Sequence, residues 1–376
     1  MQAGAIGFTT SRSDNHETSD NRPVASRLAS WDEVRRLVGV MGDLGVGVFE
    51  LAREPESVSR DPERREESLR RLTQLAVESG VPITFGTMSP HHVTYLDDVA
   101  RAGGRAIGQT HSRGINSVMS FRTRLPFDVL PEWKEVRAQS LEAQRQALAN
   151  PDVRQKLIHA AHHGAYPKAI GAEARRPDYD AMCVFDQALP PHPSVAEVAR
   201  QRGMDPVELV IDLSEKSDFN QLFIQQITPF TLDELRTSMK HPRTVMTFSD
   251  SGAHVSQISD SSIHTYLLSY WVRERQDFTL EEAVRMLTLA PATAWGFADR
   301  GLIREGFVAD LNVFDPDTVA PELPTVATDL PGDAKRLVQK ACGFLATVVA
   351  GEVVLDRGVP TGALPGRLLR GPLASA

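Results

Sequence analysis

Thr247-Phe248-Ser249-Asp250-Ser251-Gly252-Ala253-His254 completes and follows a predicted strand at Thr244–Ser249. An aspartate that leaves a hydrophobic strand, followed by small residues and a histidine, places a carboxylate and an imidazole at the carboxyl end of that strand. In parallel α/β folds and barrels this edge carries catalysis. The segment therefore predicts a catalytic Asp250 with His254 beside it. The alternative is that Asp250 caps the next helix and His254 is a hydrogen-bonded neighbour.

Four other β-prone apolar runs precede this strand, and helical stretches such as Pro62–Ser79 separate them. The runs are Ala5–Thr10, Val46–Leu51, Pro82–Thr87 and Arg105–Thr110. Strands that alternate with helices indicate a parallel sheet wrapped by helices. We therefore expect an α/β fold, an incomplete TIM-type (β/α) barrel of about five strands.

The alternation stops over Phe121–His241, where proline-rich joints separate short helices with capping-box starts. Further along, the sequence becomes strand-like, with a hairpin turn expected at Gly351-Glu352. We therefore divide the chain into two domains. Residues 1–300 form the partial barrel with a helical insertion at about 121–243, and residues 301–376 supply strands of a small C-terminal β-sandwich and a surface arm. Insertions between barrel strands usually cover the active-site mouth.

Composition narrows the range of partners. The 376 residues carry a formal net charge of −8 with a pI near 5.8, which argues against a nucleic acid or an anionic membrane as partner. Cys183 and Cys342 lie far apart without CxxC spacing, so we expect neither a disulfide framework nor a cysteine-only zinc site. Two reduced thiols, with no apolar run of membrane-spanning length and no leader, predict a cytoplasmic protein.

Residues at the ends of other strands are further candidates for a site. His111 and Arg113 follow the strand that ends at Thr110, so His111 faces the same edge as Asp250. The guanidinium of Arg113 is a fixed fork of donors that suits a substrate carboxylate. Arg12 and His16 follow the first strand and are candidates of the same kind. The alternatives are a hydrogen-bonded loop histidine and a surface salt bridge.

Two other groups of histidines are better interpreted as surface or loop residues than as parts of a functional site. His159, His162 and His163 have the i, i+3, i+4 spacing that can chelate a metal, but such clusters are usually exposed helix faces. His91-His92 follows the third strand and is interpreted as the start of a loop.

An ordered series of motifs surrounds these candidates and resembles a known family. Gly4–Arg12 with His16 opens the series, and a helix ending in Thr288-Leu289-Ala290-Pro291 follows Asp250. The segments Asp299–Ile303, Gly306–Leu311 and Ala350–Val354 complete it. In this order they resemble the amidohydrolase superfamily, in its N-acyl-D-amino-acid deacylase (D-aminoacylase-like) branch. The resemblance covers nearly the whole chain and corresponds to the family fold without its N-terminal third.

The resemblance implies a metal-dependent hydrolase of N-acyl amide bonds in small molecules, N-acyl-D-amino acids foremost, with zinc as the cofactor. Asp250 matches the residue that contacts the metal site and moves a proton from water to the leaving amine. The predicted metal ligands are Asp250 and His111. The predicted substrate contacts are His111, Arg113, His254, Arg12 and His16.

The sequence departs from the family at other metal ligands. The family's His-x-His pair on strand one and its ligand on strand two have no counterpart, and the matching strand ends at 48–53 and 83–88 hold no histidine. A catalytic zinc takes at least three protein ligands. The alternative function is therefore an inactive homologue or fragment that binds a small molecule or needs a partner chain. An incomplete barrel leaves strand edges unpaired, which favours a homo-oligomer.

Overall fold

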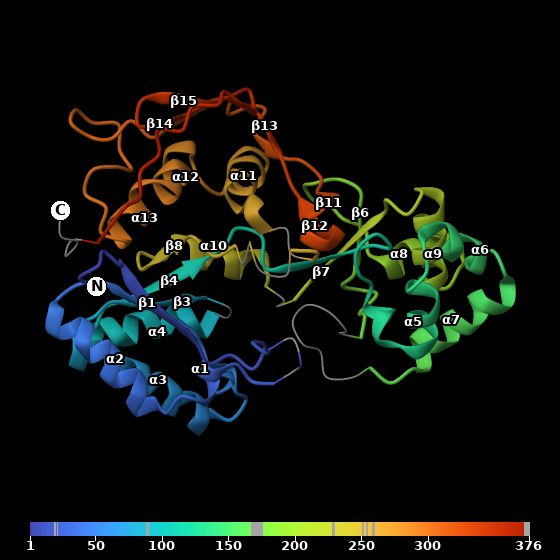
Figure 1. Ribbon diagram of the computed structural model, residues 1–376, viewed down its shortest axis with the longest axis horizontal. Helices are drawn as coiled ribbons and strands as arrows, with labels where there is room; N and C mark the ends of the chain where they lie inside the picture. Colours follow the sequence, from blue (N-terminus) through green and yellow to red (C-terminus); the bar gives the residue numbers. More distant parts are fainter. Residues whose placement is uncertain are drawn as a thin grey trace.

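A five-stranded parallel sheet organises the N-terminal part of the chain (Figure 1). Its spatial order is β1-β2-β3-β4-β8, with β1 (Gly7–Ser11), β2 (Val48–Ala52), β3 (Ile83–Gly86), β4 (Ala106–Thr110) and β8 (Thr244–Met246). The computed structural model describes residues 1–18, 20, 22–87, 90–166, 176–227, 230–249, 252, 255–257 and 260–371. All five predicted strands are present close to their expected bounds. The prediction of a partial (β/α) barrel of about five parallel strands is confirmed.

Helices cover one face of this sheet (Figure 1). They are α2 (Trp31–Leu44), α3 (Pro62–Ser79) and α4 (Pro90–Arg101), with the short α1 (Ala25–Leu28) and the 3-10 turn η1 (Pro55–Val58) between strands. Side chains alternate along a strand, so Phe49, Leu51, Ile83 and Phe85 all point to the helices and form one core with them. The helix α4 begins at Pro90, so the predicted loop start at His91-His92 is wrong. Both histidines lie in the first turn of α4.

The opposite face of the sheet is polar. The Gln109 amide donates to Glu50 Oε1 at 2.7 Å and to Thr84 Oγ1 at 3.2 Å. Glu50 is exposed, whereas Gln109 and Thr84 are buried. The two faces therefore differ in kind, and only the helix-covered face is an apolar core.

Gly108 lets β4 pack closely against its neighbours in the sheet and against α4. A Cβ at this position would lie 2.6 Å from Thr87 Cγ2, 2.8 Å from Leu96 Cδ1 and 3.1 Å from Thr244 Cγ2. These methyl groups belong to three surrounding elements that are themselves packed. A side chain at position 108 therefore has no free volume to occupy.

We predict that Gly108→Ala lowers the free energy of unfolding by about 1–3 kcal/mol through overpacking. The matched control is Gly39→Ala in α2, where a Cβ meets nothing within 4 Å. That substitution should stabilise the chain by about 0.5–1 kcal/mol, because alanine loses less backbone entropy in a helix than glycine. Urea denaturation of both variants measures the difference, and equal effects would contradict the packing described for β4.

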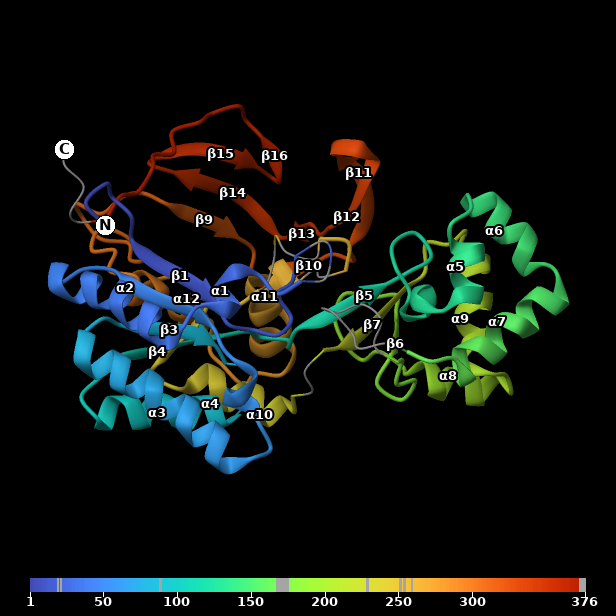
Figure 2. The ribbon, with the colours of Figure 1, turned by 60° about the horizontal axis from the view of Figure 1, so that its bottom comes forward.

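Between β4 and β8 the chain builds a separate layer with its own apolar core (Figure 2). An antiparallel sheet of order β5-β7-β6 links it to the rest, with β5 (Asn116–Met119), β6 (Cys183–Phe185) and β7 (Leu222–Gln226). The helical elements are η2 (Pro126–Val129), α5 (Pro131–Arg137), α6 (Leu141–Leu148), α7 (Pro151–His163), α8 (Val195–Arg202) and α9 (Pro206–Lys216). The helices agree with the predicted helical insertion. The sheet was not predicted, because strands buried on both faces lack polar alternation.

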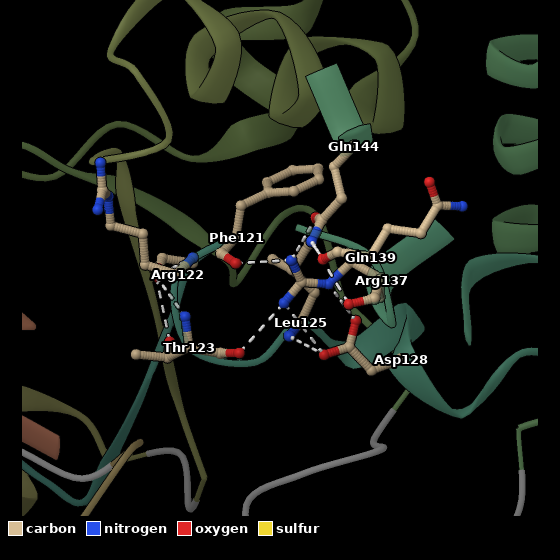
Figure 3. Close-up of polar contacts among 9 residues, drawn as sticks. Phe121, Arg122, Thr123, Leu125, Asp128, Arg137, Gln139 and Gln144 are labelled. Carbon is tan, nitrogen blue, oxygen red and sulfur yellow. Dashed lines mark hydrogen bonds and ion pairs between the residues drawn. The ribbon is translucent and has the colours of Figure 1, made fainter. Parts of the chain in front are cut away.

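Arg137 ties the first turns of this layer together (Figure 3). Its guanidinium donates to Asp128 Oδ1 at 2.8 Å, to the Phe121 carbonyl at 2.6 Å and to Gln144 Oε1 at 2.9 Å. Arg137 Nη2 also donates to the Thr123 carbonyl at 3.1 Å. Two carbonyls of the turn at 121–123, the carboxylate of Asp128 and the amide of Gln144 thus all accept from one nearly buried guanidinium, as the planar geometry of arginine permits. The cation of Arg137 is used structurally.

The C-terminal part packs over β8 and ends in antiparallel strands (Figure 1). Helix α10 (Leu232–Lys240) runs beside β8 and is followed by η3 (Asp260–Ser262), α11 (Ile263–Tyr266), the π-helix η4 (Leu267–Glu274), α12 (Leu280–Leu287) and α13 (Leu289–Ala294). Next comes a sheet of order β16-β15-β14-β9, with β9 (Leu311–Phe314), β14 (Phe344–Val349), β15 (Glu352–Asp356) and β16 (Val359–Pro360). The paired strands β10 (Ala320–Pro321) and β13 (Ala341–Cys342), and the hairpin of β11 (Thr325–Leu330), η5 (Pro331–Asp333) and β12 (Ala334–Val338), complete the chain. The expected C-terminal antiparallel strands are thereby confirmed.

Residues 370–371 lie beside the first residues of the chain. The Gly371 amide donates to the Gly4 carbonyl at 2.8 Å, and Arg370 Nη1 donates to the Ala3 carbonyl at 2.8 Å. In the part of the chain that the structure describes, no helix has the length and apolar character needed to cross a membrane.

Candidate functional site

The carboxyl ends of the five parallel strands meet at one edge of the sheet. β1 is followed there by Arg12, β2 by Arg53 and β4 by His111, whereas β8 leads through Phe248 toward position 250. In parallel sheets this edge is the usual place for a ligand site. Asp250 and His254 lie outside the described residues, so their predicted roles stay predictions.

His111 is the first residue after β4 and is only 1% exposed. Its Nδ1 accepts a hydrogen bond from the Gly114 amide at 2.9 Å. The ring packs edge-on against Phe230, with centroids 5.3 Å apart, and lies 6.3 Å from the ring of Phe248. Burial lowers the pKa of His111 to about 4, because the apolar surroundings disfavour the imidazolium. His111 is therefore a neutral, buried imidazole at the predicted edge.

The two residues after His111, Ser112 and Arg113, are held in place by contacts with the C-terminal helices. Ser112 Oγ donates to the Ile263 carbonyl at 2.7 Å, and the indole of Trp271 donates to the Ser112 carbonyl at 2.6 Å. Arg113 Nη1 donates to Ser262 Oγ at 2.9 Å, and its guanidinium lies 5.3 Å from the ring centroid of Tyr266. The guanidinium is thus held in a fixed place. Arg113 is 8% exposed, so the alternative of a surface salt bridge does not describe it.

The insertion reaches this edge through His192, in the loop before α8. Burial lowers the pKa of His192, and the nearby charge of Arg113 lowers it further. Its ring packs edge-on against Phe185 of β6, with centroids 5.3 Å apart. Its Nδ1 is buried and has no hydrogen-bond partner in the described residues. His192 was missed in the sequence, because a proline-rich joint carries no periodicity that would place it beside Arg113.

Arg12 and His16 lie at the β1 end of the edge. Arg12 Nε lies 3.1 Å from Glu54 Oε2, Arg12 Nη1 donates to the Ala29 carbonyl at 2.7 Å, and the guanidinium is 5.8 Å from the Trp31 ring centroid. These contacts join β1, the turn before α2 and the end of β2. His16 is exposed and hydrogen-bonds through Nδ1 to Ser11 Oγ. Their predicted role as substrate contacts stays a prediction.

Arg53, after β2, was also missed. Its guanidinium lies 4.5 Å from the Phe85 ring centroid and contacts His92 Nε2. The residue as a whole is partly exposed, but its Nη1 atom is buried and has no hydrogen-bond partner in the described residues. Burial lowers the pKa of Arg53 to about 9. His92 is 2% exposed, and burial and then the charge of Arg53 lower its pKa. Only the unforeseen start of α4 at Pro90 brings this pair together.

The described residues do not fit a catalytic metal. Among them, no three or more His, Cys, Asp or Glu side chains are arranged to hold a metal ion. Of the two predicted ligands only His111 is described, and its Nδ1 is occupied by the Gly114 amide. A catalytic zinc takes at least three protein ligands. No step of a reaction is therefore assigned to a metal.

The hollow of about 700 Å³ between α3 and α4 is a separate feature. It is lined by side chains such as Leu69, Thr73, Val77 and Tyr95, on the helix layer outside the sheet. None of the predicted site residues lines it. The strand-end edge, with its buried His111 and Arg113, is the better candidate because its polar groups converge.

Comparison with known proteins identifies the family of the chain. A family model described as Amidohydrolase family matches residues 134–355, which is more than half of the chain. The chain belongs to the amidohydrolase family. This amidohydrolase is 30% identical over 185 residues to the N-acyl-D-aspartate deacylase of Alcaligenes xylosoxydans xylosoxydans, which covers 46% of the chain and 32% of the relative. It is 29% identical over 199 residues to the N-acyl-D-glutamate deacylase of the same organism, covering 48% of the chain and 35% of the relative.

Solved structures share the fold of the amidohydrolase. The N-acyl-D-glutamate deacylase from Bordetella bronchiseptica, complexed with zinc and a phosphonate inhibitor, matches with a TM-score of 0.52 at 19% identity. That match covers 98% of this chain and 63% of the solved chain. A D-aminoacylase matches with the same TM-score at 17% identity. With the curated relatives, these matches confirm the predicted D-aminoacylase-like branch, although the chain spans less than two thirds of each relative's length.

We predict that His111 makes the free energy of unfolding depend on pH. Its pKa is about 4 in the fold and 6.5 in an unfolded chain, so the unfolded state binds more protons between these pH values. Stability therefore rises with pH through this window, and about 3 kcal/mol is lost as the pH falls from 6.5 to 4. Denaturation at a series of pH values should give a flatter profile for His111→Phe than for the unmodified chain.

The control for this measurement is His159→Phe on the exposed face of α7. That variant should keep the slope of the unmodified chain. Parallel profiles for His111→Phe and the unmodified chain would show that His111 is not buried as a neutral ring.

Proposed function

We propose that this amidohydrolase hydrolyses the N-acyl amide bond of N-acyl-D-amino acids. The single observation that carries the proposal is the 30% identity to an N-acyl-D-aspartate deacylase within a chain whose family match covers residues 134–355. The strand-end edge supports it, because the neutral imidazole of His111 and the cationic guanidinium of Arg113 are buried there. A neutral hydrogen-bonding group suits an amide carbonyl, and a guanidinium suits the carboxylate of an anionic substrate.

The proposed proton carrier is Asp250. A carboxylate at this position accepts a proton from the attacking water and returns it to the nitrogen of the leaving amine. The C–O bond forms first, as water adds to the carbonyl carbon, and the C–N bond then breaks once the nitrogen has received the proton, so the products are a carboxylic acid and a free amino acid. His254, two residues beyond Gly252, is proposed as a substrate contact beside it.

Arg113 is the proposed anchor for the carboxylate of the amino acid. A guanidinium binds a carboxylate through two parallel hydrogen bonds, which fixes both position and orientation. Contacts to Ser262 and Tyr266 hold this fork before any substrate arrives. Arg12 and His16 are proposed as further contacts at the β1 end of the same edge.

Zinc is the proposed metal, because the solved deacylase from Bordetella bronchiseptica is a zinc complex. Zinc polarises an amide carbonyl and activates water in hydrolases of this type. The described residues do not supply three ligands, so we expect weak binding. Cytoplasmic location and self-association remain proposals on the sequence grounds given above.

We also propose the two-domain division at about residue 300, with the insertion as a unit inside the first domain. The separate apolar core of the insertion around Trp133 and Phe223, distinct from the core of Phe49 and Phe85, supports the insertion as a unit. The antiparallel sheet of β9, β14, β15 and β16, whose strands all follow residue 300, supports the boundary.

The test is turnover of N-acetyl-D-aspartate and N-acetyl-D-glutamate, with the L-enantiomers as controls. We expect release of the free D-amino acid in the presence of excess zinc, and less than one zinc per chain by elemental analysis after dialysis. Asp250→Asn should reduce turnover about 10²–10⁴-fold, because the amide cannot take the proton, while the melting temperature stays unchanged. Undiminished turnover in Asp250→Asn would contradict its role.

An inactive homologue that only binds a small molecule is the second candidate. The observation that favours it is the absence of a three-ligand metal group from the described residues. Saturable binding of N-acetyl-D-aspartate without turnover, with zinc present, would decide for it and against the hydrolase.

A further inference from the structure

The two ring nitrogens of His111 have different surroundings. Nδ1 accepts the Gly114 amide hydrogen at 2.9 Å. A ring nitrogen that accepts a hydrogen bond uses its lone pair and carries no proton, so the neutral ring has its proton on Nε2. Nε2 is buried and has no hydrogen-bond partner in the described residues.

A turn fixes this tautomer. Gly114 has a φ of +78°, in the left-handed region that glycine adopts without strain. This backbone conformation directs the Gly114 amide back at the ring three residues earlier. The turn is itself anchored by the hydrogen bond from Trp271 to the Ser112 carbonyl. The ring therefore cannot release Nδ1 without breaking an anchored turn.

The unused donor at Nε2 is costly. A buried polar group without a partner lowers the stability of the fold, and such groups are rare in native proteins. The contact with Gly114 explains an acceptor at Nδ1 but not a buried donor at Nε2, and the rings of Phe230 and Phe248, with centroids 5.3 and 6.3 Å from that of His111, provide aromatic contacts that need no N–H donor. The position is the first residue after β4, at the edge of the sheet where a ligand is expected.

We propose that His111 Nε2–H is a hydrogen-bond donor to the acyl carbonyl oxygen of the substrate, and that His111 is not a metal ligand. This inference rests on the proposed function for the identity of the substrate. The two phenylalanine rings make the surroundings apolar, which suits a neutral carbonyl better than a carboxylate. As water adds to the carbonyl carbon, negative charge grows on this oxygen, and a preset donor stabilises it more than it stabilises the ground state. An Nε2 that carries a proton has no lone pair to offer a metal.

The experiment compares two substitutions, each of which replaces the hydrogen-bonding group at only one of the two ring nitrogens. His111→Asn retains an acceptor near Nδ1 and loses the Nε2 donor, whereas His111→Gln retains a donor near Nε2. We expect kcat for N-acetyl-D-aspartate to fall about 10²–10³-fold in His111→Asn and no more than about tenfold in His111→Gln. The zinc content should be equal in both variants and the unmodified chain. A merely structural role for the Gly114 contact predicts the opposite order.

Nitrogen NMR of the full chain with labelled histidine tests the proposal apart from turnover. We expect His111, assigned by its loss in His111→Gln, to carry its proton on Nε2, to be unaffected by added zinc and to shift on titration with N-acetyl-D-aspartate. A proton on Nδ1, loss of the Nε2 proton on adding zinc, or turnover that is equal in His111→Asn and His111→Gln would overturn the inference. A substrate-dependent shift without turnover would contradict only the proposed hydrolysis, and the absence of both would contradict both.

Discussion

The pairing of β4 with β8 is the contact on which the rest of the structure depends. Gly108, Gln109 and Thr110 are in register with Thr244, Val245 and Met246. Residues 111–243 lie between these two strands in the sequence, so the pairing closes a very long loop. The loss of chain entropy on closing this loop must be offset by the packing around the two strands. Gly108 permits that packing, since Thr87, Leu96 and Thr244 leave no room for a Cβ. The Phe248 amide extends the pairing past the strand by donating to the Thr110 carbonyl at 3.1 Å.

This pairing explains why polar residues from distant parts of the sequence share one edge. It puts His111 beside the segment that leads to position 250, and it fixes where the insertion departs and returns. On return, Ser238 of α10 lies 2.9 Å from Thr110 Oγ1, hydroxyl to hydroxyl. Two hydrogen bonds then hold the residues after β4 against the C-terminal helices, one from Ser112 Oγ to the Ile263 carbonyl and one from the Trp271 indole to the Ser112 carbonyl. The insertion brings His192 close enough to Arg113 for the charge of the guanidinium to lower the histidine pKa.

The sequence alone predicts the parallel sheet well, because each of its strands is a short apolar run bounded by helical signals. It predicts the antiparallel strands β5 to β7 poorly, because runs such as Leu222–Gln226 are buried without alternation. Among the candidate residues, position after a predicted strand suffices to place His111 and Arg113 at the carboxyl edge of the sheet. The contact between Arg53 and His92 could not be foreseen, since it depends on α4 beginning at Pro90. The tautomer of His111 depends on a backbone turn, which no pattern of residue types specifies.

Hydrogen–deuterium exchange with and without N-acetyl-D-aspartate tests most directly whether the β4–β8 edge is the ligand site. The account predicts slower exchange in peptides that cover residues 107–114 and 244–250 when the ligand is present. Peptides from the hollow between α3 and α4, lined by Tyr95 and Leu69, should exchange at the same rate in both conditions. Protection confined to α3 and α4, with none at 107–114 or 244–250, would contradict it.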